Sequence, residues 1–558
     1  MYLFSDKFYP FSRTFSRSLP GLMLMLAAGL AVSGAGPVQA QVSGAATGGT
    51  AVMIPATVPQ TSGFRQALAA AASGDEAVQN FFRDRGYDPF WTAEGAEGIT
   101  RRAALLAALD GAGFHALPVA RYDAEGLRQG FAQLRSEGDR GRLEIRMTRA
   151  LLDYARDLSS GVLTPARIDP GIVRTLPRPE EPVVLAAFAA DPQRLLNSLS
   201  PRNPEYVRLL RARAELQQQI RDGGWGRGVT AKSLRPGAQG AEVIALRDRL
   251  SAMGYLGRSA TASYDGTIVA AVRAFQEDQG LTADGVAGEA TLRALNTAAE
   301  ERLAAVTVAI ERERWSNIPR GDRHIWVNLT DYTVKLIDDG KVSFETRAVI
   351  GSTKDDKRTP EFSHRMTYLE VNPDWTVPPG IIRRDYLPKL QANPNALGHL
   401  KVVDSRGREI PRSAINFAAY TPRNFPFSLK QPPGPSNALG RVKFMFPNPW
   451  SIYLHDTPDK HLFARDARAF SSGCVRLNDP FDFAYALLAR QSDDPKGLFQ
   501  RVLNSGKQTR INLEEPVPVH LDYRTAFSDA RGKMQYRRDI YGRDAAIHAA
   551  LVKAGVTP

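Results

Sequence analysis

The chain has 558 residues, and its 43% hydrophobic content is ordinary for a soluble globular protein with substantial cores. This length argues for several domains of roughly 100–200 residues each. The net charge of +13 favours polyanionic surroundings, such as an anionic polymer, a membrane surface or nucleic acid. The basic residues are scattered and form no nucleic-acid motif, so we expect no nucleic-acid partner. The single cysteine excludes an internal disulfide.

Residues 1–40 have the pattern of an export signal, with a basic start, an apolar stretch over residues 19–35 and a small-x-small site at residues 38–40. The apolar stretch is short for a membrane span, which needs about 20 residues. We therefore expect a cleaved signal peptide, and an uncleaved membrane anchor is the alternative. Residues 41–63 are rich in Gly, Ala, Thr and Pro, a composition that predicts a linker.

Apolar residues spaced three and four apart predict a helical domain over residues 64–220. Gly86 and Gly113 stand where two of its helices are expected to end. The domain also contains a group of aromatic residues, for which a ligand-binding cluster is one interpretation and core packing the favoured one. These residues are Phe81, Phe82, Tyr87, Phe90 and Trp91.

Residues 234–297 predict a separate small module of three helices. A Gly-rich turn precedes the first helix, whose apolar residues recur at helical spacing from Val243 to Met253. Asp265-Gly266 begins the second helix, and Asp284-Gly285 precedes the third. A further helix over residues 301–314 leads to the next domain.

From residue 323 the apolar period changes to two, which predicts a β-rich domain over residues 323–515 and a C-terminal tail over residues 516–558. Asp339-Gly340 marks a hairpin turn. The predicted fold class is therefore multidomain α+β. Further short strands are expected at residues 366–371, 442–446, 451–454, 501–513 and 517–521.

A long insertion within residues 376–440 interrupts this domain. A structureless loop of this length is unusual in a compact domain unless it is functional, and a passive, locally packed insertion is the alternative. We expect its aromatic residues and Trp375 to line a groove, and Arg383 and Arg384 to meet carboxylates.

The chemistry concentrates in residues 451–479, which contain Cys474, the only cysteine of the chain. A thiol needs a base to become a nucleophile near neutral pH, and His455 stands nineteen positions earlier at a predicted strand end. The Gly473–Cys474 turn can supply backbone N–H groups to an oxyanion. A buried, inert cysteine is the alternative for an isolated Cys/His pair.

The flanking sequences YLHDT and SSGCVRL resemble the catalytic signature of L,D-transpeptidases with a YkuD-type domain. Many members of that family have a histidine at the position of Ser472. The SSGC sequence found here is similar to the large, lidded branch of the family. Residues 64–220 resemble the scaffold domain of this branch, residues 234–297 its peptidoglycan-binding module, and residues 376–440 its lid over a β-rich catalytic sandwich.

The resemblance implies that Cys474 is the nucleophile, His455 the general base and Gly473 part of the oxyanion turn. It implies a stem tetrapeptide of peptidoglycan as substrate and a 3→3 cross-link as product. Tyr453 is expected on the same side of its strand as His455, as an oxyanion donor, a substrate contact or a core residue. The remaining residues expected to bind substrate are Arg476, Ser472 and Trp375.

Two other functions remain open: an L,D-carboxypeptidase or endopeptidase with water as acceptor, and a catalytically inactive wall-binding protein. The chemistry requires no cofactor, and the sequence shows no ligand cluster for a metal. An export signal with wall chemistry implies the periplasm of a Gram-negative bacterium. Expected partners are peptidoglycan stem peptides, with other wall-synthesis enzymes and, through an uncleaved signal, the membrane as further candidates.

Overall fold

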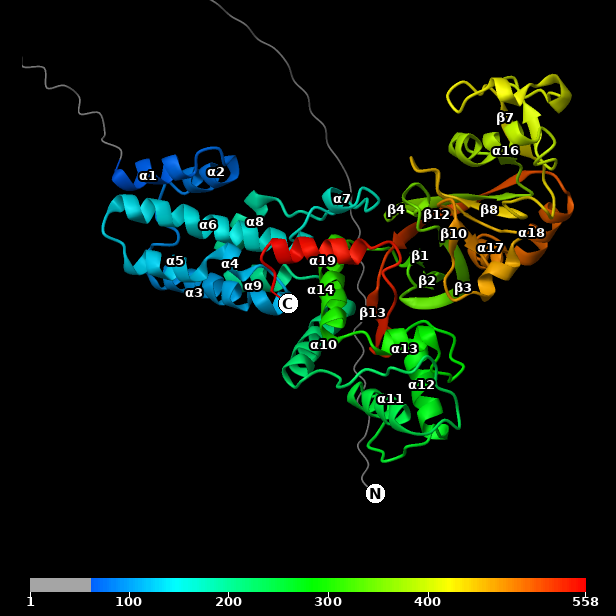
Figure 1. Ribbon diagram of the computed structural model, residues 1–558. Helices are drawn as coiled ribbons and strands as arrows, with labels where there is room; N and C mark the ends of the chain where they lie inside the picture. The colour runs from blue at the N-terminus through cyan, green and yellow to red at the C-terminus, as the bar shows by residue number, and fades with distance from the viewer. Residues whose placement is uncertain (1–61, 558) are drawn as a thin grey trace, which may run out of the picture. The chain divides into compact units, whose positions relative to one another are not determined.

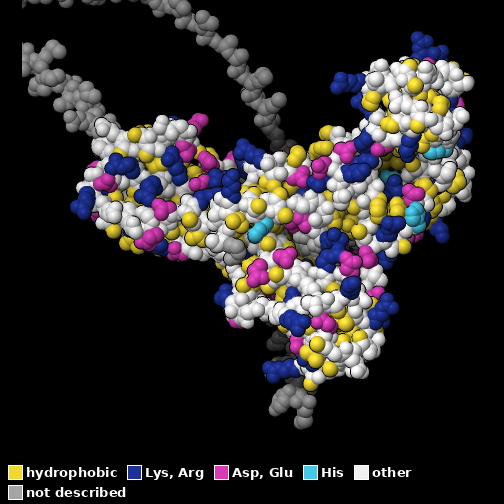
Figure 2. Space-filling model, viewed as in Figure 1, with side chains coloured by type: hydrophobic (Ala, Val, Ile, Leu, Met, Phe, Trp, Pro, Cys, Tyr) yellow, Lys and Arg dark blue, Asp and Glu magenta, His cyan; other side chains and the backbone are white. Residues whose placement is uncertain are grey.

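The computed structural model describes residues 62–557 (Figure 1). The predicted export signal over residues 1–40, and all but the last two residues of the predicted linker over residues 41–63, lie outside the described residues. Within residues 62–557, no helix has both the length and the apolar character that a membrane span needs. On the face seen in Figure 2, Lys and Arg side chains are interspersed with Asp and Glu.

The first domain is a helical bundle around the long helix α6 (Glu137–Ser160) (Figure 1). A capping box begins α6, because the side chains of Ser136 and Asp139 each accept a hydrogen bond from the other residue's backbone N–H. Apolar side chains from the surrounding helices form one continuous core with α6. These helices are α1 (Gly63–Ala71), α2 (Glu76–Asp84), α3 (Ala96–Asp110), η1 (Gly111–His115), α4 (Val119–Tyr122), α5 (Ala124–Ala132), α8 (Glu181–Ala190) and α9 (Pro192–Ser198).

The aromatic group predicted to pack in this core does so. Three of its residues are at most 1% exposed, and the other two pack against the same core. The buried Glu144 carboxylate accepts hydrogen bonds from the backbone N–H groups of Phe90, Trp91 and Thr92, which fixes the corner that holds the aromatic rings. One predicted helix end is wrong: α3 is capped by Gly111, so Gly113 lies inside η1.

A second apolar core joins α10 (Pro204–Arg221), α14 (Ala299–Trp315) and α19 (Arg543–Lys553) with the short helix α7 (Pro165–Ile168). The helix predicted over residues 301–314 is confirmed as part of α14. The paired strands β13 (Ala526–Ser528) and β14 (Met534–Tyr536) also contribute to this core. Much of the segment predicted as a C-terminal tail is therefore packed against α7, α10 and α14.

The three helices predicted for the small module are confirmed as α11 (Ala241–Ala252), α12 (Gly266–Asp278) and α13 (Glu289–Leu295). The Asp265 carboxylate caps α12 by accepting hydrogen bonds from two backbone N–H groups of its first turn. The apolar faces of the three helices meet in a core of their own.

A nine-stranded mixed sheet forms the core of the β-rich domain, in the order β10-β3-β11-β9-β8-β4-β12-β1-β2. An additional pairing of β2 with β3 closes the sheet on itself around an apolar interior. The predicted turn at Asp339-Gly340 is confirmed, with both residues at positive φ between β2 and β3. The strands are β1 (Arg323–Asn328), β2 (Thr333–Asp338), β3 (Lys341–Gly351), β4 (Phe362–Val371), β8 (Val442–Met445), β9 (Leu454–His455), β10 (Ala469–Ser471), β11 (Val475–Leu477) and β12 (Thr509–Asp522).

The predicted multidomain α+β class is thus confirmed, but three elements of the sheet differ from the sequence prediction. The strand predicted over residues 451–454 is shorter and is the two-residue β9, Leu454–His455. Ser451 has a positive φ of 54°, which is not an extended conformation. Helix α18 (Pro495–Asn504) occupies the start of the strand predicted over residues 501–513. Strand β12 continues through residues 515 and 516, where the sequence placed a domain boundary, with a bulge between Asn512 and Val517. Helix α17 (Pro480–Leu488) and α18 pack together beside the sheet.

The insertion is a folded subdomain with its own core and is not a structureless loop. Its strands pair in the order β5-β7-β6, and the buried side chains of Leu390, Val402, Phe417 and Leu429 lie between sheet and helices. Its elements are β5 (Trp375–Thr376), α15 (Pro379–Ile381), η3 (Ile382–Tyr386), α16 (Leu387–Ala392), β6 (Lys401–Val403), η4 (Arg412–Ala414), η5 (Phe417–Ala419) and β7 (Ser428–Gln431).

Candidate active site

Cys474 lies in the tight turn between β10 and β11, and its side chain is partly exposed. Gly473 adopts φ 125°, a conformation that side-chain-bearing residues rarely take. The buried Ser471 hydroxyl spans the turn, since it accepts a hydrogen bond from the Gly473 N–H at 3.1 Å and donates to the Cys474 carbonyl at 2.5 Å. The turn that carries the thiol is therefore held in one geometry from inside.

Tyr453 faces Cys474 across two neighbouring strands. Strands β9 and β11 run parallel with Leu454 opposite Val475, so the residues one step earlier, Tyr453 and Cys474, lie side by side. Both the backbone N–H and the side chain of Tyr453 favour the thiolate of Cys474. The thiol itself donates to the Ser451 carbonyl at a sulfur–oxygen distance of 3.6 Å.

Burial nevertheless raises the pKa of the Cys474 thiol to about 11, although the Tyr453 donors, Lys443 and Arg476 act in the opposite direction. Burial also raises the pKa of Tyr453 well above its usual value, and the neighbouring Cys474 adds to this effect. At neutral pH the resting site therefore holds a neutral thiol beside a neutral phenol.

His455 is almost completely buried at the end of β9, and its ring makes an edge-to-face contact with Tyr453 at a centroid distance of 5.6 Å. The His455 Nδ1 lies 2.5 Å from the Asp456 carbonyl oxygen. Because a carbonyl oxygen only accepts hydrogen bonds, Nδ1 carries a proton in this contact. Burial, reinforced by the positive charge of Arg476, lowers the pKa of His455 to about 3. The imidazole is therefore neutral at physiological pH.

Two cations lie near the thiol and the imidazole. Arg476 pairs in register with His455 and forms an ion pair with Asp459 at 2.9 Å. Lys443 on β8 forms an ion pair with Glu370 at 2.9 Å and lies over the Tyr453 ring, 5.2 Å from its centroid. Their positive charges favour the thiolate of Cys474, which is the form that attacks a carbonyl.

The oxyanion donors differ from the sequence prediction. The Gly473 N–H already donates to Ser471 and is therefore not available. Within residues 62–557, no hydrogen-bond acceptor is paired with the Cys474 N–H, so this group is the donor that the turn can offer an oxyanion. The predicted substrate contact Ser472 lies exposed at the tip of the same turn.

The insertion residues expected to contact substrate are largely engaged elsewhere. Trp375 is only 8% exposed and packs in the core of the insertion, which assigns it a structural role in place of a groove position. Arg384 forms ion pairs with Asp356 and Asp385, so its charge is already neutralised. The insertion reaches the site through Tyr453, whose side chain packs against both the insertion core and the core of the large sheet.

Residues that sequence reasoning missed support the site from behind. Asp456 supplies the carbonyl that binds His455, and its carboxylate accepts hydrogen bonds from the Arg441 N–H and the Lys460 ammonium. Thr359, more than a hundred residues before Cys474, donates its hydroxyl to the Gly473 carbonyl. No local pattern in the sequence marks Thr359, because only the fold brings it to Gly473, whereas Asp456 directly follows His455 in the sequence YLHDT.

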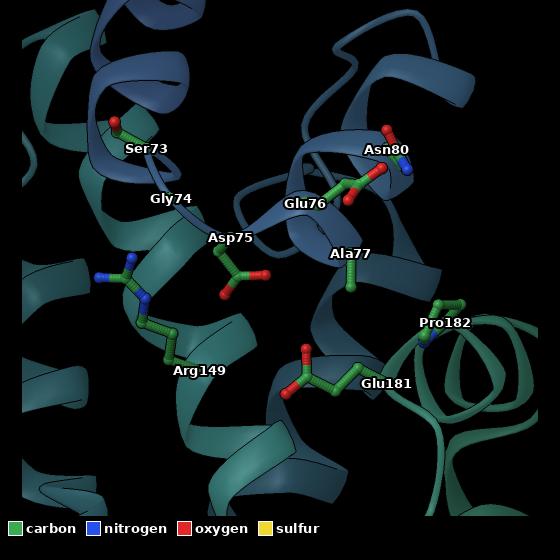
Figure 3. Close-up of a pocket in the computed structure, with 9 residues that line it drawn as sticks. All are labelled: Ser73, Gly74, Asp75, Glu76, Ala77, Asn80, Arg149, Glu181 and Pro182. Carbon is green, nitrogen blue, oxygen red and sulfur yellow. The ribbon is translucent and has the colours of Figure 1, made fainter.

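A separate pocket of about 780 Å³ lies in the helical bundle and contains none of the predicted site residues (Figure 3). Asp75, Glu76, Glu181 and Arg149 project around it, and the Asp75 side chain is engaged in capping α2. Within the described part of the chain, no group of three or more His, Cys, Asp or Glu side chains is arranged to hold a metal ion.

Comparison with family models assigns three parts of the chain. Residues 322–519 match the model described as "L,D-transpeptidase catalytic domain". The chain therefore contains a YkuD-type L,D-transpeptidase catalytic domain. Residues 76–212 match the "Scaffold domain" model and residues 239–295 the "Putative peptidoglycan binding domain" model. The three-domain resemblance predicted from the sequence is thus confirmed.

A curated relative described as "Putative L,D-transpeptidase" from Haemophilus influenzae is 34% identical over 247 residues, which cover 44% of this chain. The match spans about half the length of that relative, 49%. The solved structures that this chain resembles include an L,D-transpeptidase fragment from Xylanimonas cellulosilytica. They also include a fused Zn-dependent amidase/peptidase/peptidoglycan-binding protein from Clostridium acetobutylicum. The first is 15% identical with a TM-score of 0.17, covering 53% of this chain and all of that one. The second is 13% identical with a TM-score of 0.15, covering 52% and 99%. At these TM-scores neither structure informs the fold.

Proposed function

We propose that this protein is an L,D-transpeptidase that forms 3→3 cross-links between peptidoglycan stem peptides in the periplasm, where its predicted export signal would deliver it. The observation that carries the proposal is the arrangement around Cys474. The thiol lies beside Tyr453 within the matched catalytic domain, near an imidazole that burial keeps neutral at physiological pH. A group with these features suits acyl transfer through a thioester.

In the first half of the reaction, Cys474 attacks the carbonyl that precedes the terminal D-alanine of a tetrapeptide. The S–C bond forms as the thiol proton moves to His455 Nε2. The oxyanion accepts a hydrogen bond from the Cys474 N–H. The C–N bond to D-alanine then breaks, and the imidazolium returns the proton to the leaving amine. The products are an acyl-enzyme thioester and free D-alanine.

In the second half, an amine from a neighbouring stem peptide attacks the thioester carbonyl. His455 removes a proton from this amine, the new C–N bond forms, and the thiol leaves with the proton restored. Water in place of the amine would release a tripeptide and make the protein a carboxypeptidase. The neutral resting pair means that proton transfer accompanies attack, because a stable thiolate–imidazolium pair does not precede it.

Incubation of the full chain with purified disaccharide tetrapeptides, followed by mass spectrometry of the products, tests this proposal. We expect cross-linked dimers with loss of one D-alanine per dimer bond. Tripeptide monomers alone would support the hydrolytic alternative. No turnover of tetrapeptides by the wild-type protein, with Cys474 reduced, would support the inactive wall-binding alternative.

A further inference from the structure

Thr359 connects the nucleophile turn to the opposite side of the domain. It lies between the 3-10 helix η2 (Asp355–Lys357) and β4, and its side chain is fully buried. Its hydroxyl donates to the Gly473 carbonyl at 2.7 Å and accepts from the Gly351 N–H at 2.9 Å. The donor capacity of the hydroxyl is therefore used on the residue that directly precedes Cys474.

The Gly473 carbonyl and the Cys474 N–H belong to the same peptide unit. A peptide unit is planar, and in the trans form its C=O and N–H groups point in opposite directions. A hydrogen bond that fixes the carbonyl end of this unit consequently fixes the direction of the N–H at the other end. That N–H is the donor that the turn offers to the oxyanion, whereas Ser471 holds the preceding peptide unit through the Gly473 N–H.

Thr359 is itself held firmly on the side away from the thiol. Its backbone N–H donates to the Tyr541 hydroxyl at 3.3 Å, and that hydroxyl donates to the Gly351 carbonyl at 2.6 Å. The Arg543 guanidinium, 2% exposed, donates to the Thr359 carbonyl at 3.2 Å. A Cβ at Gly351 would lie 2.6 Å from the Thr359 nitrogen, so only glycine permits this close packing.

The anchor extends to other parts of the chain. Arg543 forms ion pairs with Glu361 at 3.2 Å and with Asp169 at 3.0 Å, and Arg312 on α14 forms an ion pair with the same Glu361 at 2.6 Å. Glu361 also pairs through its backbone with Ile172 of the scaffold region. Buried charged residues of α14, α19 and the scaffold region thus hold Thr359 in place, and Thr359 in turn holds the turn that contains Gly473 and Cys474.

We propose that Thr359 is a positioning residue that aims the Cys474 N–H at the oxyanion of the acyl-transfer step. This inference rests on the proposed role of Cys474 as an acylated nucleophile. Loss of the Thr359 hydroxyl should therefore slow reactions of the thiol that form an oxyanion. Reactions of the thiol that form no oxyanion should be little affected.

Two reagents separate these effects without peptidoglycan. A p-nitrophenyl ester acylates the thiol through an oxyanion: the S–C bond forms, the C–O bond breaks, p-nitrophenolate leaves, and the thiol proton passes to His455. Iodoacetamide alkylates the thiol by displacing iodide, with no oxyanion. The ratio of the acylation rate to the alkylation rate, both measured at Cys474 in the full chain, therefore reports on oxyanion stabilisation alone.

The variants are Thr359→Val, which keeps the shape and removes the hydroxyl, and Thr359→Ser, which restores it. We expect Thr359→Val to lower the ratio of acylation to alkylation at least about 10-fold. Removal of a whole oxyanion donor lowers the rate about 10²–10³-fold, and misalignment of the donor should cause part of that loss. Thr359→Ser should return the ratio to within about twofold of wild type. Thr330→Val, at another buried threonine of the same domain, is the matched control and should leave it unchanged.

An unchanged ratio in Thr359→Val would overturn the role of Thr359 while leaving Cys474 as nucleophile. Equal loss of both rates, or failure of Thr359→Ser to restore the ratio, would assign Thr359 to thiol placement or folding and would also overturn it. If the wild-type thiol is alkylated but never acylated, both this inference and the proposed function fail.

Discussion

Tyr453 and Cys474 immediately precede the parallel strands β9 and β11 and lie side by side, and both the backbone N–H and the side chain of Tyr453 favour the Cys474 thiolate. The same tyrosine ring contacts His455 and packs against the core of the insertion. Thiol, base and insertion therefore meet at one side chain.

Tyr453→Phe should keep this packing and remove only the hydroxyl donor. A hydrogen bond to a charged group contributes about 1.5–3 kcal/mol, so we expect the acylation rate to fall about 10- to 100-fold as the thiolate loses one donor. The thermal midpoint should change by little, since the ring remains. Steady-state acylation and a melting curve check this, and an unchanged acylation rate would mean that the phenol is only a packing group.

The pH dependence of thiol reactivity should be unusual for a nucleophilic cysteine. Since burial raises the pKa of Cys474 to about 11, the thiol is protonated below that pH and its alkylation rate should keep rising beyond pH 9. The lowered pKa of His455, about 3, means that no imidazolium is present near neutrality to stabilise a thiolate. Iodoacetamide rates from pH 5 to 10 test this. A plateau already reached near pH 7 would reveal a resting ion pair.

The choice of base can be tested with two histidines six positions apart. His455 is buried beside Tyr453, whereas His461 is exposed in the short helix η6 (Lys460–Ala464). We expect His455→Ala to lose at least about 100-fold in turnover, at the lower end of general-base contributions, and His461→Ala to retain normal turnover. The reverse result would transfer the role of base to His461.

The insertion can be deleted without opening the large sheet, because its two ends lie next to each other. Val371 pairs with Val442, and the Asn372 N–H donates to the Arg441 carbonyl, so the two ends of the insertion are adjacent. Replacing residues 374–439 with a short Gly/Ser turn should leave thiol labelling intact, lower cross-linking and raise the share of hydrolysed product, because a cover that excludes water would be lost. The dimer-to-tripeptide ratio decides this. The same ratio at the same total rate would show that the insertion is not a catalytic lid.

The helices and the catalytic turn could be predicted from the sequence because their signals are local. The spacing of apolar residues predicted helices α11 to α14. The Asp339-Gly340 pair predicted a hairpin turn because both residue types readily adopt positive φ. The nucleophile and the base were candidates because Cys474 is unique and His455 lies close to it in the sequence. Each of these inferences used residues within about twenty positions of one another.

The remaining features depend on contacts that the local sequence does not encode. The insertion has strands of two to four residues separated by Pro- and Gly-rich segments, so no period identifies its core. Strand β12 contains Pro516 and Pro518, which lowered its expected strand character. Thr359 and Gly473 are 114 residues apart, and only the folded sheet makes them partners.

The acyl-enzyme on Cys474 is tested most directly by intact-mass spectrometry of the protein after brief mixing with a disaccharide tetrapeptide without added acceptor. We predict an adduct equal to the substrate minus D-alanine, mapped by peptide digestion to Cys474 and absent from Cys474→Ala at unchanged secondary structure. An adduct on another residue, or turnover of the tetrapeptide by Cys474→Ala, would contradict the central claim that Cys474 carries the acyl group.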